Sequence, residues 1–166
     1  MTDTDSKHYI SFKFPRSKRR EEADVLMNAA NFFLDELLKR CTIDYSLNIK
    51  ISLKTGYCHV DGSENEGLAW SRMINETRWY YVHLNNNVPF LELLSTLAHE
   101  LVHVVQFATG RLKNEENWIW DGMDYGENPY QNDAELDSAN LPWEYEAHTK
   151  EIVLAKKFVK QYYSNW

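Results

Sequence analysis

Apolar residues recur three to four positions apart in two long stretches of the chain, and a third stretch is apolar almost throughout. Residues 21–40 open with acids and close with Lys39 and Arg40, which suits the dipole of a helix. Residues 143–163 follow Pro142 directly. The third stretch runs from Pro89, a residue suited to a first helical turn, to Gly110, a typical end signal. We expect a helix in each stretch.

Shorter stretches alternate between apolar and polar residues, as half-buried strands do. Residues 46–54 alternate strictly, and residues 8–14 alternate less regularly and predict a first strand or an arm. Residues 57–60, 68–73 and 78–85 read as further short strands, with a loop at 61–67 between them. The pattern therefore predicts an α+β fold, with an N-terminal helix, a small and mostly antiparallel sheet, and two later helices.

Residues 111–141 show no sustained helical or strand spacing of apolar residues, and they are acidic and rich in Trp and Tyr. Connections this long inside a compact domain are uncommon and are often functional. Within the segment, Asp121–Gly122 lies between WIW and MDY, which is the signal of a two-residue hairpin.

Composition narrows the class of protein. The length of 166 residues fits one domain spanning 1–166, with 1–20 as a possible flexible or edge-strand arm. The net charge of −7 makes nucleic acid an unlikely partner, and the basic cluster at 13–20 is expected to be a solvated helix entry. Cys41 and Cys58 read as free thiols, and no secretory signal or membrane span is visible, so we expect a cytoplasmic protein without a membrane partner.

The sequence His99-Glu100-Leu101-Val102-His103 lies in the apolar stretch and carries the candidate chemistry. Two His residues four apart lie on one helix face, one turn above the other, so both imidazoles can reach one metal ion. The Glu between them is rotated about 100° around the helix, which suits a general base acting on a water at the metal. Polar groups on a buried helix need a partner, and a zinc ion supplies one. We therefore expect zinc as the cofactor.

Zinc bound by two His needs a third protein ligand and an open position. The last helix offers Glu144, Glu146, His148 and Glu151. Our choice is Glu146, because the small Ala147 after it lets the two helices approach closely. Glu144 and His148 remain alternatives.

The strings TLAHELVHVVQFATG and LPWEYEAH resemble the gluzincin branch of zinc metallopeptidases, and more narrowly small, uncharacterised phage and bacterial proteins with HELxHxxQ and PWExEA elements. The resemblance covers roughly residues 80–155. It implies a minimal zincin-like domain, zinc, peptide-bond hydrolysis, His99 and His103 as ligands, Glu100 as base and Glu146 as third ligand. It also implies that the strand Trp79–Asn85 edges the cleft and binds an extended peptide. Were the chain phage-encoded, it would act in the host cytoplasm.

The expected function is therefore a zinc-dependent metallopeptidase acting on a protein or peptide through a water activated by Glu100 at the zinc ion. The oxyanion of the reaction needs a further donor, for which Tyr145 and His148 on the last helix, or Tyr125 and Tyr130 in the long segment, are candidates. Two other functions stay open: a zinc-bound binding or regulatory module without turnover, and a DNA-associated protease of the SprT-like kind.

Overall fold

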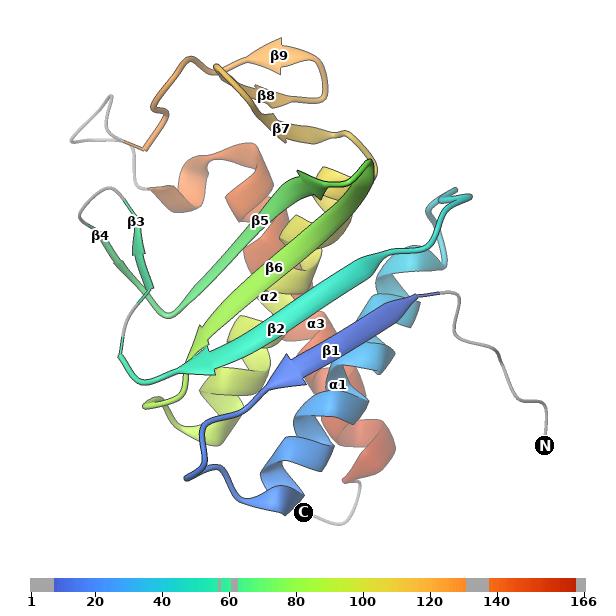
Figure 1. Ribbon diagram of the computed structural model, residues 1–166, viewed down its shortest axis with the longest axis vertical. Helices are drawn as coiled ribbons and strands as arrows, with labels where there is room; N and C mark the ends of the chain where they lie inside the picture. Colours follow the sequence, from blue (N-terminus) through green and yellow to red (C-terminus); the bar gives the residue numbers. More distant parts are fainter. Residues whose placement is uncertain (1–7, 57, 61–62, 131–137, 164–166) are drawn as a thin grey trace.

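The computed structural model describes residues 8–56, 58–60, 63–130 and 138–163. It is an α+β structure in which three long helices lie behind a four-stranded sheet (Figure 1). The helices are α1 (Arg20–Leu38), α2 (Phe90–Ala108) and α3 (Pro142–Tyr162), with a short 3₁₀ turn η1 (Ser138–Asn140) before α3. None of these helices has the length and apolar composition needed to cross a bilayer.

The main sheet has the strand order β1-β2-β6-β5, from β1 (Tyr9–Lys13), β2 (Asn48–Lys54), β6 (Thr77–Asn85) and β5 (Gly67–Ile74). Strands β1, β2 and β6 are parallel, and only β5 is antiparallel to its neighbour. The prediction of a mostly antiparallel sheet was therefore wrong. The long helix α1 joins β1 to β2, and a connection that crosses back over the sheet in this way makes neighbours parallel.

Strand β5 forms one edge of this sheet, because it pairs with β6 alone among the described residues. The expectation that the strand Trp79–Asn85 edges the cleft was wrong, since β6 lies between β2 and β5. The tight hairpin at Asn75 and Glu76 pairs one side of β6 with β5, and β2 occupies the other side of β6, so β5 is outermost.

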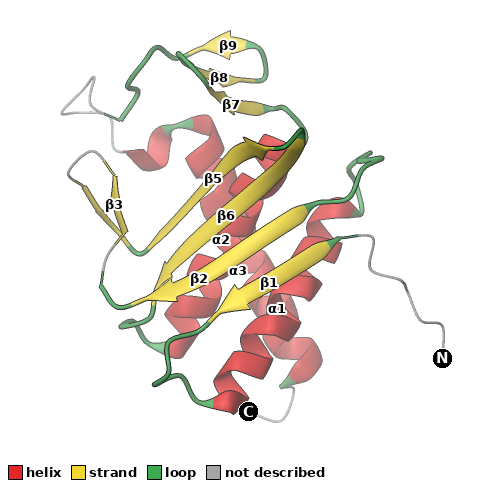
Figure 2. Ribbon diagram, in the orientation of Figure 1, coloured by secondary structure: helices red, strands yellow, loops and turns green. Residues whose placement is uncertain are grey.

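Two smaller sheets accompany the main one (Figure 2). Strands β3 (Cys58–Val60) and β4 (Ser63–Asn65) form a hairpin where a loop was expected at 61–67. Strands β7 (Leu112–Asn114), β8 (Trp118–Trp120) and β9 (Met123–Asp124) form the third sheet. The hairpin predicted at Asp121–Gly122 is confirmed, with φ of 46° and 84° at the two residues, as a primed turn requires.

The core lies between the inner face of the sheet and the helices. Helix α2 packs on β5, β6, α1 and α3, which explains why it is buried around most of its circumference. A second apolar cluster sits beneath the β7–β9 sheet and is built from Leu112, Trp120, Leu141 and Trp143. The site described next lies between these two clusters, where α2 faces α3. Cys41 is a free thiol as expected, and the side chain of Cys58 lies outside the described part of the chain.

Candidate metal centre

His99 and His103 point toward the same place from one face of α2. Their Nε2 atoms are 3.1 Å apart, and their ring centroids are 4.8 Å apart. The two residues are separated by one helical turn, which sets this closeness. His103 is buried, with 8% of its surface exposed, so its polar nitrogens need partners inside the protein.

Glu144, in the first turn of α3, brings a carboxylate oxygen to both imidazoles. Its Oε2 is 3.2 Å from His99 Nε2 and 3.4 Å from His103 Nε2. These three atoms therefore form a nearly equilateral triangle. Donor atoms bound to a tetrahedral zinc ion lie about 3.3 Å from one another, given the usual zinc–nitrogen and zinc–oxygen distances. The spacing of the three atoms fits a small divalent cation seated among them.

The outer nitrogen of each imidazole is held by a further side chain. His99 Nδ1 lies 2.6 Å from Glu151 Oε2, and His103 Nδ1 lies 2.8 Å from Gln106 Oε1. A neutral imidazole that donates from Nδ1 to such an oxygen keeps its lone pair on Nε2. Metal-binding histidines are commonly oriented in this manner. With a metal ion in place of the ring protons, both rings would present Nε2 acceptor atoms to the space beside Glu144.

Glu144 has its own supporting contact. Tyr130 donates its hydroxyl hydrogen to Glu144 Oε1 at 2.8 Å, and Trp143 Nε1 donates to the Tyr130 oxygen at 2.8 Å. The Trp143 ring is fully buried in the cluster beneath the β7–β9 sheet. This chain of hydrogen bonds leaves Oε2 of Glu144 free to face the imidazoles.

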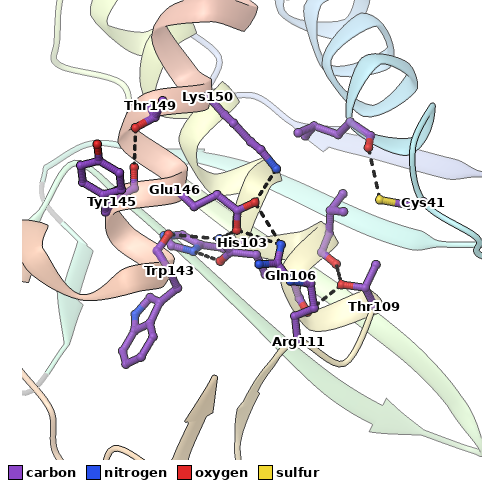
Figure 3. Close-up of polar contacts among 12 residues, drawn as sticks. Cys41, His103, Gln106, Thr109, Arg111, Trp143, Tyr145, Glu146, Thr149 and Lys150 are labelled. Carbon is purple, nitrogen blue, oxygen red and sulfur yellow. Dashed lines mark hydrogen bonds and ion pairs between the residues drawn. The ribbon is translucent and has the colours of Figure 1, made fainter. Parts of the chain in front are cut away.

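Glu146 is not brought to the imidazoles, contrary to its choice as third ligand. Its carboxylate binds Arg111 Nη1 at 3.0 Å, Lys150 Nζ at 2.5 Å and Gln106 Nε2 at 3.1 Å (Figure 3). Two positions along a helix correspond to a rotation of about 200°, so Glu144 and Glu146 leave α3 on nearly opposite sides. Glu146 instead supports the site indirectly, because it accepts a hydrogen bond from the same Gln106 that contacts His103.

The other predicted residues divide into two groups. His148 and Tyr130 line the cleft described below, whereas Tyr145 and Tyr125 are absent from its lining. Tyr145 is 67% exposed, and Tyr125 packs edge-on against Trp143 at 5.1 Å between ring centroids. The hydroxyl of Tyr130 is engaged by Glu144, which leaves His148 as the predicted donor whose side chain is both accessible and beside the imidazoles.

His148 also belongs to a group that could hold a metal ion. One ligand atom each from His99, Glu144 and His148 lies within 4.8 Å of the other two. The His148 ring is 4.6 Å from the His99 ring, and its side chain is about half exposed. Its Nδ1 is 3.6 Å from Glu151 Oε1. The structure thus provides a candidate metal centre at the α2–α3 interface.

Charges at the centre favour a cation. Burial opposes a charge on His99, but hydrogen bonds that its ring donates to the carboxylates of Glu144 and Glu151 outweigh burial and raise its pKa to about 10. Burial likewise opposes a charged His103, whose pKa is nevertheless raised by Glu144. Burial would raise the pKa of Glu144, yet His103 and His99 hold that pKa well below its usual range. The carboxylates therefore make the space between the rings favourable for positive charge.

Glu100 lies next to these residues and is 5% exposed. Burial raises the pKa of its carboxyl to about 7, against the opposing attraction of His103 and His99. A carboxyl whose pKa lies near 7 can both accept and return a proton at neutral pH. The start of β5 packs directly on Glu100, because a Cβ added at Gly67 would lie only 2.4 Å from Glu100 Oε1. The absence of a side chain at Gly67 allows β5 to pass this close to Glu100.

These residues open into a cleft of about 1350 Å³. One wall is β5 from Gly67 to Ser71, the floor is α2 with Glu100 and both imidazoles, and the far wall comes from α3 and the β7–β9 sheet. The described part of the segment 111–141 contributes to the cleft through residues such as Trp118 and Tyr130. The candidate metal centre thus lies at the bottom of a groove bordered by β5, whose outer edge is unpaired within the part of the chain that the structure describes.

Sequence reasoning did not assign the roles of Gln106, Glu151, Arg111 or Gly67. The first two carried a readable signal. Gln106 is three residues after His103, on the same helix face, and Glu151 is two turns after Glu144. The contact of Arg111 with Glu146 and the approach of Gly67 to Glu100 are tertiary, and no local pattern predicts them.

Comparison with known proteins provides no relative: no family model matches the chain, and no curated protein or solved structure matches it significantly.

Proposed function

We propose that this chain is a zinc-dependent peptidase with a minimal zincin-like fold of the gluzincin type. Its zinc ligands would be His99, His103 and Glu144, and its general base Glu100. One observation carries the proposal: three donor atoms from α2 and α3 meet within 3.1–3.4 Å of one another, beside a buried glutamate. Nitrogen and carboxylate donors without thiolate, open to a cleft on one side, are typical of catalytic zinc sites.

The chemistry is divided between the ion and the chain. When bound, zinc would supply a Lewis acid that polarises a carbonyl oxygen and makes water a better nucleophile at neutral pH. Glu100 would accept the proton of the attacking water on its carboxylate and pass it to the leaving amine, for which a pKa of about 7 is well suited. His148, half exposed at the same cleft, would donate a hydrogen bond to the oxyanion.

The free edge of β5 supports a peptide as the substrate. Alternate backbone N–H and C=O groups of an edge strand are open to pairing, and an extended peptide can add to them as a further strand. Residues Gly67–Ser71 lie along the cleft, and their β6-facing side is already paired. A peptide added at this edge would run past Glu100 and the imidazoles.

The test compares the wild-type chain with Glu100→Gln. Both proteins are expected to bind about one zinc ion per chain, because Glu100 is not a ligand. Only the wild type is expected to cleave casein or a peptide library, and Glu21→Gln, the same change at an exposed position of α1, should cleave as the wild type does. Cleavage that persists in Glu100→Gln would contradict the role of the base. A wild-type protein that binds zinc but cleaves nothing would favour a non-catalytic binding module.

A further inference from the structure

The face of the main sheet that points away from the helices carries an unusual set of side chains. The strand registers align these outward positions into three rows that cross β1, β2, β6 and β5 in turn. The rows are Tyr9-Asn48-Trp79-Arg72, Ser11-Lys50-Tyr81-Trp70 and Lys13-Ser52-His83-Leu68. Beyond the third row, Lys54 continues the same face of β2. Their neighbours Ile49, Ile51, Tyr80 and Val82 are buried on the helix side, which fixes the orientation of the strands.

None of these outward positions carries an acid, although the chain as a whole has a net charge of −7. Four are cations, namely Lys13, Lys50, Lys54 and Arg72, and none of the four forms an ion pair with another residue in the described part of the chain. The basic side chains that do form pairs lie elsewhere, for example Lys18 and Arg19 on Glu22. This face of the sheet therefore carries unpaired positive charge and no acid at the positions named.

Aromatic rings occupy the middle of the same face. The ammonium of Lys50 lies 4.3 Å from the centre of the Trp79 ring and 5.9 Å from that of Tyr81. Trp70 stacks on Tyr81 with ring centroids 5.3 Å apart. Tyr9 meets Trp79 edge-on at 6.5 Å and is 57% exposed. These rings are not needed for the core, which lies on the other side of the sheet.

No helix in the described part of the chain covers this face, because all three long helices lie behind the sheet (Figure 2). We propose that this open face, defined by the three rows and Lys54, binds single-stranded nucleic acid. Unpaired lysine and arginine attract phosphates, and aromatic rings on a sheet provide surfaces against which unpaired bases stack. An acidic polypeptide would meet the cations but leave the rings without a matching group. The net charge of −7 is a sum over the whole chain and conceals such a surface, although it made nucleic acid an unlikely partner on sequence grounds.

The test is fluorescence anisotropy with a labelled oligo-dT of about twelve nucleotides, near the site size of sheet-based binders. If all four cations contact phosphates, affinity should fall about 50-fold between 50 and 200 mM salt, since each contact contributes about 0.7 to the slope for single strands. Binding should be unchanged by a zinc chelator and by Glu100→Gln. This separates the proposal from the proposed peptidase activity, because either one can fail alone.

Two variants locate the surface. Lys50→Glu should weaken binding and reduce the salt dependence, whereas Lys160→Glu, an equal charge reversal at an exposed position on α3, should weaken it far less. Trp79→Ala should weaken binding about five-fold or more through lost stacking. Circular dichroism verifies that each variant is folded, and Lys50, being exposed, provides a test that does not disturb the core.

Three results would overturn the proposal. The first is no anisotropy change up to about 100 µM protein at 50 mM salt, the weak limit of non-specific binding. The second is an equal loss of affinity in Lys50→Glu and Lys160→Glu. The third is displacement of the oligonucleotide by poly-glutamate at the same charge concentration as by unlabelled oligo-dT, which would identify a surface for acidic polypeptides.

Discussion

Replacing Gly67 with Ala perturbs the most crowded contact of the site by a single methyl group. The added Cβ would lie 2.4 Å from Glu100 Oε1, 2.7 Å from Glu100 Cγ and 2.7 Å from Thr96 Cγ2. Ordinary contact begins at 3.4 Å, so Glu100 or the strand must move by about 1 Å. Glu100 is only 5% exposed, so moving its side chain disturbs buried contacts. Overpacking of this kind costs about 1–3 kcal/mol of unfolding free energy.

Urea denaturation measures that cost, and thermal melting should show a decrease in Tm of about 2–12 °C. Ser71→Ala, on the same strand but adding no atom, should change stability by less than about 0.5 kcal/mol. A Glu100→Ala background removes two of the three nearest contacts and leaves that with Thr96, so the penalty of Gly67→Ala should fall by half or more. Equal penalties in both backgrounds, or no penalty at all, would refute the close packing of β5 on Glu100.

The remaining predictions concern the support of the site and the core. Gln106→Ala and Glu151→Ala each release the outer nitrogen of one imidazole, and each should lower zinc affinity about 10–100-fold in competition with a chelating dye. Unchanged zinc affinity in both variants would show that these contacts do not orient the imidazoles. Leu97→Ala should cost about 2–5 kcal/mol in urea denaturation, because Leu97 is fully buried where α2 meets the sheet. A cost below about 1 kcal/mol would mean that the core repacks around the lost side chain.

The sequence predicts α2 and its two imidazoles well because both are properties of one helix. An almost continuous apolar run between Pro89 and Gly110 fixes the helix, and a spacing of four residues fixes the shared face. The parallel order of the main sheet, by contrast, is not a property of any single helix or strand. It depends on which strands pair after α1 crosses the sheet, and strand periodicity carries no information about pairing partners.

The choice of Glu146 rather than Glu144 as the third ligand shows the limit of reasoning from the sequence of a single helix. The phase of α3 is set by its buried residues Ala147, Leu154 and Phe158. Glu144 lies three residues before Ala147 and Glu151 four residues after it, so both share the buried face. Glu146 pairs with Lys150 at i,i+4, a spacing typical of a surface ion pair. The apolar spacing of α3 thus indicates that Glu144 and Glu151 lie on its buried face. The contact of Glu146 with Arg111 instead depends on where the β7–β9 sheet packs.

A zinc competition titration of three proteins, the wild type, Glu144→Gln and Glu146→Gln, tests the central claim most directly. The wild type should bind one zinc ion per chain. Glu144→Gln should lose more affinity than the about 10–100-fold typical of a supporting residue, because it loses a ligand, and Glu146→Gln should stay within that range. A wild type that binds no zinc, or a larger loss in Glu146→Gln than in Glu144→Gln, would contradict the metal centre described here.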